Sequence, residues 1–427
     1  PYCLGMDTTR FPLVPGTSPT MVTKAEGVWL HTSEGARFLD AGGGAIVTNI
    51  GHGRPEIAQV AAEALSRLDY VVPVFATEAR VALVEEVSDN WLPDPSWRCV
   101  FVSGGSESVD AAIRVAQLHH VASGRPERFK VIGRDISYHG ATLGALSAGT
   151  HDRRRKGLEK ALITMPKTSH YDPEQLEKVI EIEGPETISA FIGEPVIGAA
   201  AGAYVPPPDY WPRIAEICAK NEILLIADEV MTGFGRLGTA MGHAALNFTP
   251  DIIAAGKGLG GGYVPIGGVY CRPGVVEPIG NSDLALMFYT FAGHDMCCAV
   301  AGKVLEIVRE EDLVSRADSM GQLLRERLNE EFSDHPNVDD VRGLGLLQGL
   351  GLVANRETGE PFPRSSAFGE LVSSIALEKG VWIYPSGSGI FEDAVMFGPP
   401  FTVEETHIDE MVTTTRQAID TAVSQVS

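Results

Sequence analysis

The sequence has little positive charge and lacks paired cysteine motifs and long apolar runs. Its 427 residues carry 34 Lys and Arg against 56 Asp and Glu, a formal net charge of -22. A surface this acidic repels phosphates, which argues against a nucleic-acid or anionic-membrane partner. No apolar run is long enough to span a bilayer, because the nearest one, from 188 to 208, is interrupted by Glu194 and by prolines.

The cysteines exclude two further classes of site. Six are present, but no C-x-x-C spacing occurs, so neither a zinc ribbon nor a thioredoxin-type motif is indicated and we expect no metal. The first residues show no basic start followed by an apolar core, the pattern of a secretory signal. We therefore expect reduced thiols and a cytoplasmic location.

Short β-rich runs alternate with amphipathic helical stretches between residues 98 and 275. The predicted strands are 98–103, 129–134, 188–194, 223–228, 251–256 and 266–271. The predicted helices are 106–122, 173–183 and 210–221. This alternation predicts an α/β fold with a mostly parallel sheet covered by helices on both faces. In such sheets the ligand crevice lies at the carboxyl ends of the strands.

The pattern changes after residue 300. A long helical run to residue 332 leads to a β-rich stretch from 338 to 353 and then to two more helical segments. We expect three parts: an N-terminal segment, 1–45, a large domain, 46–300, and a smaller α/β C-terminal domain, 301–427. The N-terminal segment includes a predicted hairpin that packs with the small domain.

Acidic residues end two of the predicted strands. Glu194 closes one strand and Asp228 another, so both should point into the same crevice. A buried carboxylate is costly unless a positive group meets it. Lys257 follows the next apolar strand in the glycine-rich bend "AAGKGLGGG", where it would face that crevice. We expect the neighbouring Glu229 to support backbone or a neighbouring chain instead.

Two other segments supply an anion cradle and flat aromatic groups. Gly105 and Ser106 lie between a strand and a helix, where free backbone N–H groups and a hydroxyl suit a phosphate. Tyr138 and His139 follow another strand region and could lie against a flat ring.

One cofactor requires all of these groups. Pyridoxal 5'-phosphate (PLP) has a phosphate, a flat pyridine ring, a ring nitrogen and an aldehyde. Lys257 would form a Schiff base with the aldehyde, and Asp228 would pair with the protonated ring nitrogen.

Each residue also has a plainer interpretation. A lysine is usually solvated, an aspartate can cap a helix, and a tyrosine often packs in a core. His139 could be a structural hydrogen-bonding residue, and Glu194 could either line the pocket or bond backbone. The glycine-rich bend is not a nucleotide P-loop, because Gly258 follows Lys257 where that motif requires Ser or Thr.

The motifs together resemble those of class III (omega-type) aminotransferases, in the fold type I PLP superfamily. They include "SGGSESVDAAIRVA", "YHGATLGALS", "LLIADEVMTGFGRLG" and "PDIIAAGKGLGGGYVPIGGV", in the expected order and over nearly the whole chain. The resemblance implies a homodimer with each active site at the subunit interface. It also implies that 46–300 is the cofactor-binding domain.

The same resemblance implies roles for individual residues. Gly105 and Ser106 would hold the phosphate, and Tyr138 would stack on the ring. Val230 would pack against the other face of the ring, and Thr290 would reach the phosphate of the cofactor in the partner subunit. Asp228 and Lys257 take the roles already given.

Two departures from the family pattern bear on the substrate. Many relatives have an arginine before the "PP" of the C-terminal domain, where Met396 stands here, and no arginine occurs between Trp382 and Pro400. Relatives often carry an aromatic residue at the position of Ile46. We expect Ile46 and Phe75 to line the substrate pocket, with Ile46 making one wall of it aliphatic and roomier.

We therefore predict transfer of an amino group, by a ping-pong mechanism, from an amine or an amino acid to a keto acid or aldehyde. A donor carboxylate would be absent, distal or held elsewhere. The alternatives on the same fold are an aminomutase or epimerase and a decarboxylase. A cofactor-free binding protein is a further alternative outside enzymes.

Overall fold

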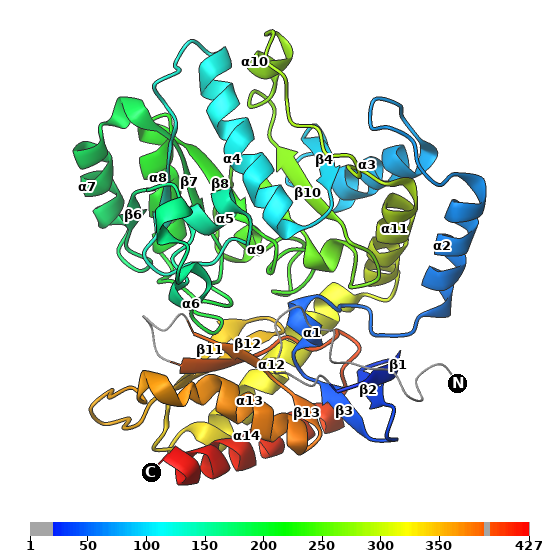
Figure 1. The fold of residues 1–427 in the computed structure, drawn as a ribbon, viewed down its shortest axis with the longest axis vertical. Coiled ribbons are helices and arrows are strands. Elements are labelled where there is room, and N and C mark those ends of the chain that lie inside the picture. Colours follow the sequence, from blue (N-terminus) through cyan, green and yellow to red (C-terminus); the bar gives the residue numbers. More distant parts are fainter. Residues whose placement is uncertain (1–19, 388–392, 427) are drawn as a thin grey trace.

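The structure is a computed structural model that describes residues 20–387 and 393–426. Figure 1 shows a larger part with a central sheet above a smaller part that contains α12 (Leu313–Phe332), α13 (Phe368–Glu378) and α14 (Glu405–Val426). The first strands of the described chain lie in the smaller part, beside its C-terminal elements. None of the helices in the described residues combines the length and apolar character that a bilayer crossing requires.

The central sheet has seven strands in the order β4-β10-β9-β8-β7-β5-β6. Their bounds are β4 (Arg98–Val102), β5 (Lys130–Arg134), β6 (Lys167–Thr168), β7 (Ile188–Gly193), β8 (Leu224–Asp228), β9 (Ile252–Ala255) and β10 (Gly267–Cys271). Only β10 runs against its neighbours β4 and β9, and the other paired strands of this sheet are parallel. The predicted mostly parallel sheet is confirmed, with β6 as an added edge strand.

Helices cover both faces of this sheet because successive strand residues point to opposite sides. In β8, Leu224 and Ile226 pack in the cluster that contains α4 (Gly105–Ala122). Leu225 and Ala227 pack in the cluster of α7 (Glu174–Glu183) and α8 (Tyr210–Lys220). Strands β9 and β10 also contact α3 (Glu78–Asn90) and α11 (Asp295–Glu310) through a third cluster. The predicted two-sided cover is confirmed.

The smaller part contains two four-stranded sheets, ordered β1-β2-β3-β13 and β11-β12-β15-β14. Their strands are β1 (Val22–Glu26), β2 (Trp29–Thr32), β3 (Arg37–Asp40), β11 (Val338–Leu344), β12 (Leu347–Leu352), β13 (Val381–Trp382), β14 (Tyr384–Ser386) and β15 (Asp393–Phe397). β2 and β3 form a hairpin, and β3 pairs with β13. The N-terminal hairpin therefore joins a sheet with a strand from the C-terminal part.

Two details differ from the sequence prediction or lie beyond it. The helical run to residue 332 is two helices, α11 and α12, because Asp312 adopts a left-handed conformation with φ of 50° between them. Residues 1–19 of the predicted N-terminal segment, including Cys3, lie outside the described residues. The domain boundaries at 45/46 and 300/301 stay predictions.

Several further helices connect these elements. They are α1 (Gly43–Ile46), α2 (Pro55–Arg67), α5 (Leu143–Ala148), α6 (Asp152–Arg155), α9 (Gly242–Ala245) and α10 (Glu277–Gly280).

A buried arginine joins segments that are distant in sequence. Arg236 is 3% exposed and donates hydrogen bonds to the carbonyl oxygens of Leu346 (3.2 Å), Pro399 (2.7 Å) and Thr48 (3.2 Å). Its guanidinium carbon lies 4.6 Å from the ring centroid of Phe401. Burial lowers the pKa of Arg236 to about 9, against the opposing charge of Asp40. One side chain thus connects the larger part to two segments of the smaller part.

Candidate active site

The carboxyl ends of four parallel strands bring the predicted site segments to one edge of the sheet. β8 ends at Asp228, and β9 leads within two residues to Lys257. The Glu229 amide donates to the Ala254 carbonyl at 2.8 Å, which holds these two strand ends in register. β4 ends at the same edge, where a Cβ placed on Gly256 would lie 3.2 Å from the Gly105 nitrogen. The two glycine segments are therefore in contact.

Asp228 forms a buried pair with His139. The carboxylate is 4% exposed, and its Oδ2 lies 2.7 Å from Nδ1 of His139, which is 3% exposed. The other oxygen, Oδ1, accepts the Val230 amide at 3.1 Å. His139 Nε2 makes no hydrogen bond within the described residues. The bond from the imidazole and the bond from the Val230 amide together fix the orientation of the carboxylate.

Lys257 lies in this acidic environment without a fixed partner. It is half-buried, has a φ of 39°, and its ammonium finds no hydrogen-bond or ion-pair partner in residues 20–387 and 393–426. Burial lowers the pKa of Lys257 to about 8, although the charges of Asp228 and Glu194 act in the opposite direction. About a tenth of this amine is therefore neutral, and hence nucleophilic, at pH 7, far more than for a lysine with the ordinary pKa of 10.5.

The first turn of α4 offers an open anion site. No side chain caps this helix at Gly104, so the first backbone N–H groups are free of intrahelical and capping partners. Ser106 Oγ accepts the Ala141 amide at 3.0 Å, which joins this turn to the segment after Tyr138. A Cβ on Gly105 would lie 2.6 Å from Val230 Cγ1, so only glycine fits here with Val230 in place.

Tyr138 is held at the edge of the site through its backbone. Its amide donates to Glu194 Oε2 at 3.1 Å, and Glu194 Oε1 accepts the Gly198 amide at 3.3 Å. Glu194 thus bonds backbone at two points, and its place in the lining of the pocket stays a prediction. The Tyr138 ring packs edge-on against His151, with ring centroids 5.7 Å apart, and lies under the guanidinium of Arg154.

Glu229 supports backbone, as predicted. Its Oε2 accepts the Thr232 hydroxyl at 2.5 Å and the Gly242 amide at 2.8 Å. Its Oε1 accepts the His243 amide at 2.6 Å and lies 3.0 Å from His243 Nδ1. These contacts close the loop from 229 to 243, which carries Val230 against Gly105.

Three predicted residues lie apart from this group within one chain. Thr290 is exposed, and Phe75 is 63% exposed on the loop before α3. Ile46 is 2% exposed, has a φ of 58°, and packs with Val196 and Met396 in a separate cluster. The expectation that Ile46 and Phe75 line the substrate pocket stays a prediction.

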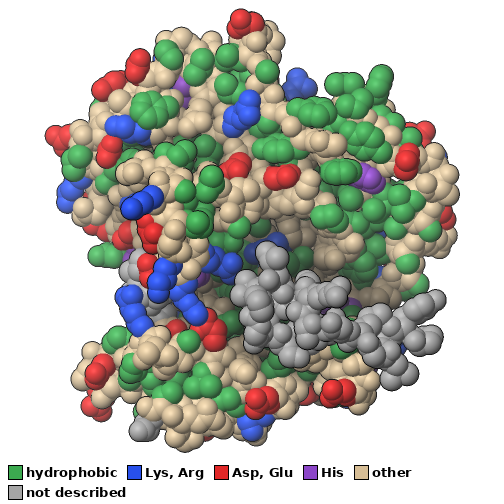
Figure 2. All heavy atoms as spheres, viewed as in Figure 1, with side chains coloured by type: hydrophobic (Ala, Val, Ile, Leu, Met, Phe, Trp, Pro, Cys, Tyr) green, Lys and Arg blue, Asp and Glu red, His purple; other side chains and the backbone are tan. Residues whose placement is uncertain are grey.

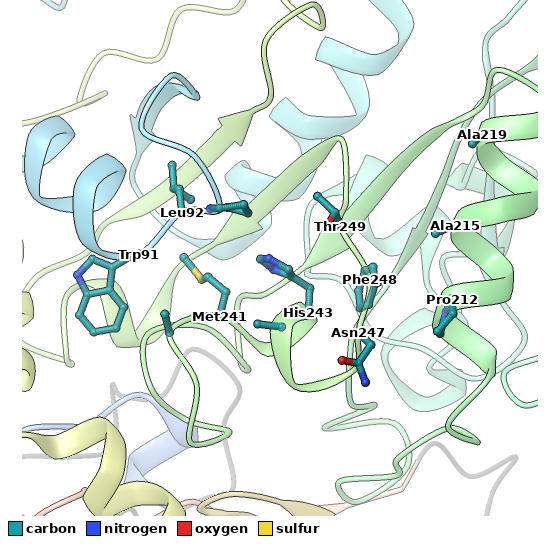
Figure 3. Close-up of a pocket in the computed structure, with 13 residues that line it drawn as sticks. Trp91, Leu92, Pro212, Ala215, Ala219, Met241, His243, Asn247, Phe248 and Thr249 are labelled. Atoms are coloured by element: carbon teal, nitrogen blue, oxygen red, sulfur yellow. The ribbon is translucent and has the colours of Figure 1, made fainter.

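A separate groove of about 770 Å³ lies on the other side of the Glu229 loop. Figure 3 shows His243 in this groove with Met241, Phe248 and Trp91 around it. The lining is mainly apolar and contains neither Asp228 nor Lys257. The groove is therefore distinct from the site at the strand ends, and the bond between His243 and Glu229 links its lining to the loop that follows Asp228.

Sequence reasoning missed two arginines near the site, Arg154 and Arg236. Arg154 stands in the visible run 153–155, but its place over Tyr138 depends on how α6 folds back onto the crevice. Arg236 stands in "GFGRLG", where nothing in the local pattern indicates carbonyl partners more than a hundred residues away.

Solved structures define the class of protein. An (S)-enantioselective omega-transaminase from Thermomicrobium roseum superposes with a TM-score of 0.91 at 33% identity, covering 97% of each chain. A Bacillus anthracis aminotransferase superposes with a TM-score of 0.90 at 31% identity, covering 96% of each chain. The fold is therefore that of the fold type I transaminases.

The sequence comparison gives the family. The Aminotransferase class-III family matches residues 14–419. Putrescine–pyruvate aminotransferase of Pseudomonas aeruginosa is 33% identical over 95% of this chain and 91% of its own length. Gamma aminobutyrate transaminase 3 of Solanum lycopersicum is 32% identical over 92% of this chain and 79% of its own length. The chain belongs to the class III aminotransferases, and it is a transaminase, as the resemblance implied.

Proposed function

We propose that this transaminase binds PLP at the strand-end site and uses Lys257 and Asp228 as its catalytic residues. The observation that carries the proposal is the buried Asp228–His139 pair at the same sheet edge as a partnerless lysine and an uncapped helix start. The residues fit the cofactor. Asp228 would hold the ring nitrogen, Gly105 and Ser106 the phosphate, and Val230 and Tyr138 would lie against the ring.

The chain supplies the proton transfers. Bound PLP supplies an aldehyde that condenses with amines and a ring that withdraws electrons from the bonds of the attached carbon. Asp228, oriented by its bond with His139, would hold the proton on the ring nitrogen. Neutral Lys257 would take a proton at Nζ from the donor carbon and return it, acting as general base and acid. Glu194 would hold Tyr138 in position through the backbone.

The substrate class we propose is an amine or a distal-carboxylate amino acid as donor, with a keto acid or aldehyde as acceptor. Relatives whose names specify putrescine with pyruvate and gamma aminobutyrate support this range. The positive φ of 58° at Ile46, a strained conformation for a β-branched residue, supports its predicted place in the substrate pocket, because such strain is often kept at functional positions.

We further infer a cytoplasmic homodimer with its active sites at the interface. Apolar side chains stand exposed on the loops before α3 and before α11: Val74 (76%), Phe75 (63%), Phe288 (62%) and Phe291 (59%). A monomer rarely leaves such a group of residues in water. Thr290 lies among them, where it could reach the site of a second copy. The described cysteines are all unpaired, which fits a reducing compartment.

Borohydride reduction of the PLP-loaded protein tests the lysine assignment. We expect the cofactor to become covalently attached to the peptide that contains Lys257, as read by mass spectrometry. The Lys257→Ala variant should lose this label and lose activity by about 10²- to 10⁴-fold or more. Lys379→Ala removes an exposed lysine and should change neither readout. A label on another lysine would overturn the assignment.

Asp228→Asn tests the carboxylate. We expect this variant to retain PLP but to lose most of its transamination, because a neutral amide does not hold the proton on the ring nitrogen. Full activity in this variant would show that Asp228 is not the partner of the ring nitrogen.

A further inference from the structure

Helix α6 places three consecutive arginines, Arg153, Arg154 and Arg155, beside the crevice between the two parts of the molecule. In Figure 1, α6 projects from the larger part towards β11 and β12 of the smaller part. Figure 2, in the same view, shows a cluster of Lys and Arg side chains in this place, along a hollow between the parts. On a chain with a formal net charge of -22, such a concentration of positive charge is unusual.

Two of these arginines have structural partners. Arg153 forms an ion pair with Glu370 of α13, which ties α6 to the smaller part. Arg155 donates to the Gly149 carbonyl. Arg154 makes no ion pair with any carboxylate in residues 20–387 and 393–426, although it is exposed. Its charge is therefore available to an anion from outside the chain.

Arg154 also lies against the proposed site. Its guanidinium carbon is 4.7 Å from the ring centroid of Tyr138, a residue anchored to Glu194 at the sheet edge. Its charge extends to Lys257, where it adds to the larger effect of burial in lowering the lysine pKa. The same charge acts on the buried His151 on the other side of the tyrosine. Arg154 is thus a cation beside the reacting groups and not a remote surface residue.

We propose that Arg154 binds the carboxylate of the substrate while the amine or carbonyl end of that substrate lies at Lys257. This inference rests on the proposed function and assigns a substrate-recognition residue to it. A guanidinium presents two parallel N–H donors that match the two oxygens of a carboxylate. The residue would supply the positive charge that the C-terminal segment lacks, since no arginine occurs between Trp382 and Pro400.

The stacking on Tyr138 suits this role. A tyrosine face holds the guanidinium plane in place and leaves the N–H groups at its edge free to donate. The arginine is therefore oriented before the substrate arrives, which reduces the ordering cost of binding. A substrate with its carboxylate several carbons from the amine would span from Arg154 to Lys257. An amine without a carboxylate would gain nothing from Arg154.

The test compares two donors that differ in the carboxylate: 5-aminopentanoate and pentylamine, each with the PLP-loaded protein in single-turnover experiments. In Arg154→Gln we expect kcat/KM for 5-aminopentanoate to fall by about 10- to 100-fold, mainly through KM. For pentylamine, kcat/KM should stay within about threefold of wild type. Arg153→Gln removes the same charge from the same helix and should leave the ratio of the two donors unchanged.

A binding measurement separates this inference from the proposed function. Calorimetry with pentanoate, an unreactive carboxylate, should give a dissociation constant that rises by about tenfold in Arg154→Gln and not in Arg153→Gln. The wild-type protein could transaminate neither donor while Arg154→Gln still weakens pentanoate binding. In that case the proposed function fails and the carboxylate site at Arg154 stands. Equal falls in kcat/KM for both donors in Arg154→Gln would show that Arg154 only supports Tyr138. Wild-type kcat/KM for both donors would show that Arg154 does not contact the substrate. Either result overturns the proposal.

Discussion

The buried carboxylate of Glu229 gives a quantitative prediction. In Glu229→Gln, one oxygen becomes an NH₂ group with nearly the same shape. Whichever way the amide turns, that nitrogen faces a backbone N–H at close range, either Gly242 at 2.8 Å or His243 at 2.6 Å. The Thr232 hydroxyl and the His243 ring can exchange donor and acceptor roles, but a backbone N–H cannot. At least one buried donor is therefore left without an acceptor.

The expected cost follows from these contacts. A hydrogen bond to a charged group contributes about 1.5–3 kcal/mol, and an orphaned buried donor costs about 1–3 kcal/mol. Since the variant loses charge assistance and leaves a donor unpaired, we expect the free energy of unfolding to fall by about 2–4 kcal/mol. This loss should lower the urea midpoint without changing the slope of the transition.

The assay is urea unfolding of the cofactor-free protein, followed by tryptophan fluorescence. Trp211 is a suitable reporter because it stacks on Phe248, 4.3 Å between centroids, beside the loop that Glu229 closes. Glu357→Gln changes an exposed glutamate and should shift the free energy of unfolding by less than about 0.5 kcal/mol. A loss of less than about 0.5 kcal/mol in Glu229→Gln would refute the four-contact arrangement.

The pH dependence of this difference provides a second check. Burial alone would raise the pKa of Glu229, but bonds from His243 and Thr232 outweigh burial and lower it below 4.5. The pKa of Glu229 is lower in the folded protein than in the unfolded chain. The ionised carboxylate therefore adds to the free energy of unfolding above pH 4.5, and this contribution is lost as the pH falls through the pKa of the folded state. The difference in the free energy of unfolding between wild type and Glu229→Gln should therefore be constant near neutral pH and shrink only below pH 4.5. A gap that closes between pH 6 and 8 would contradict this assignment.

Two further predictions concern the cofactor site. Gly105→Ala should push Val230 out of place and weaken PLP binding by about 5- to 150-fold, since overpacking costs about 1–3 kcal/mol. Gly280→Ala, where no atom lies within 4 Å of the added Cβ, should bind PLP normally, and equal affinities in the two variants would contradict the close contact at Gly105. In the cofactor-free protein, the rate at which cyanate carbamylates Lys257 should rise with pH, with a midpoint near pH 8, because burial lowers the pKa of the amine from 10.5. A midpoint above pH 10 would show that the amine is solvated.

Much of the larger part could be predicted because its strands are buried on both faces. Runs such as Leu224–Asp228 are almost wholly apolar, and the polar residue at the end of each marks the crevice edge. The positions of Asp228 and Lys257 at this edge were predicted in this way. The direction of β10 was not, since Gly267–Cys271 is apolar in either direction. The connection from Ala255 to Gly267 contains no crossover helix, which a parallel pairing would need.

The side-chain partners at the site were less accessible to sequence reasoning. The bond between His139 and Asp228 joins β8 to a segment 89 residues earlier, and nothing in the sequence around either residue indicates the other as its partner. The same is true of Arg154, whose place over Tyr138 depends on the fold of 152–155. Glu229 was correctly expected to support backbone, but its partners Gly242 and His243 become neighbours only when the loop closes.

Arg236 has a consequence for how the molecule denatures. Separating the smaller part from the larger would strip the Arg236 guanidinium of the Leu346 and Pro399 carbonyl acceptors and of its contact with the Phe401 ring. An intermediate with only the smaller part unfolded would hold a buried guanidinium without these partners. This costs several kcal/mol unless the core around Arg236 also unfolds and exposes it to water. The two parts should therefore lose their structure together, in a single cooperative calorimetric transition, although each has sheets and helices of its own.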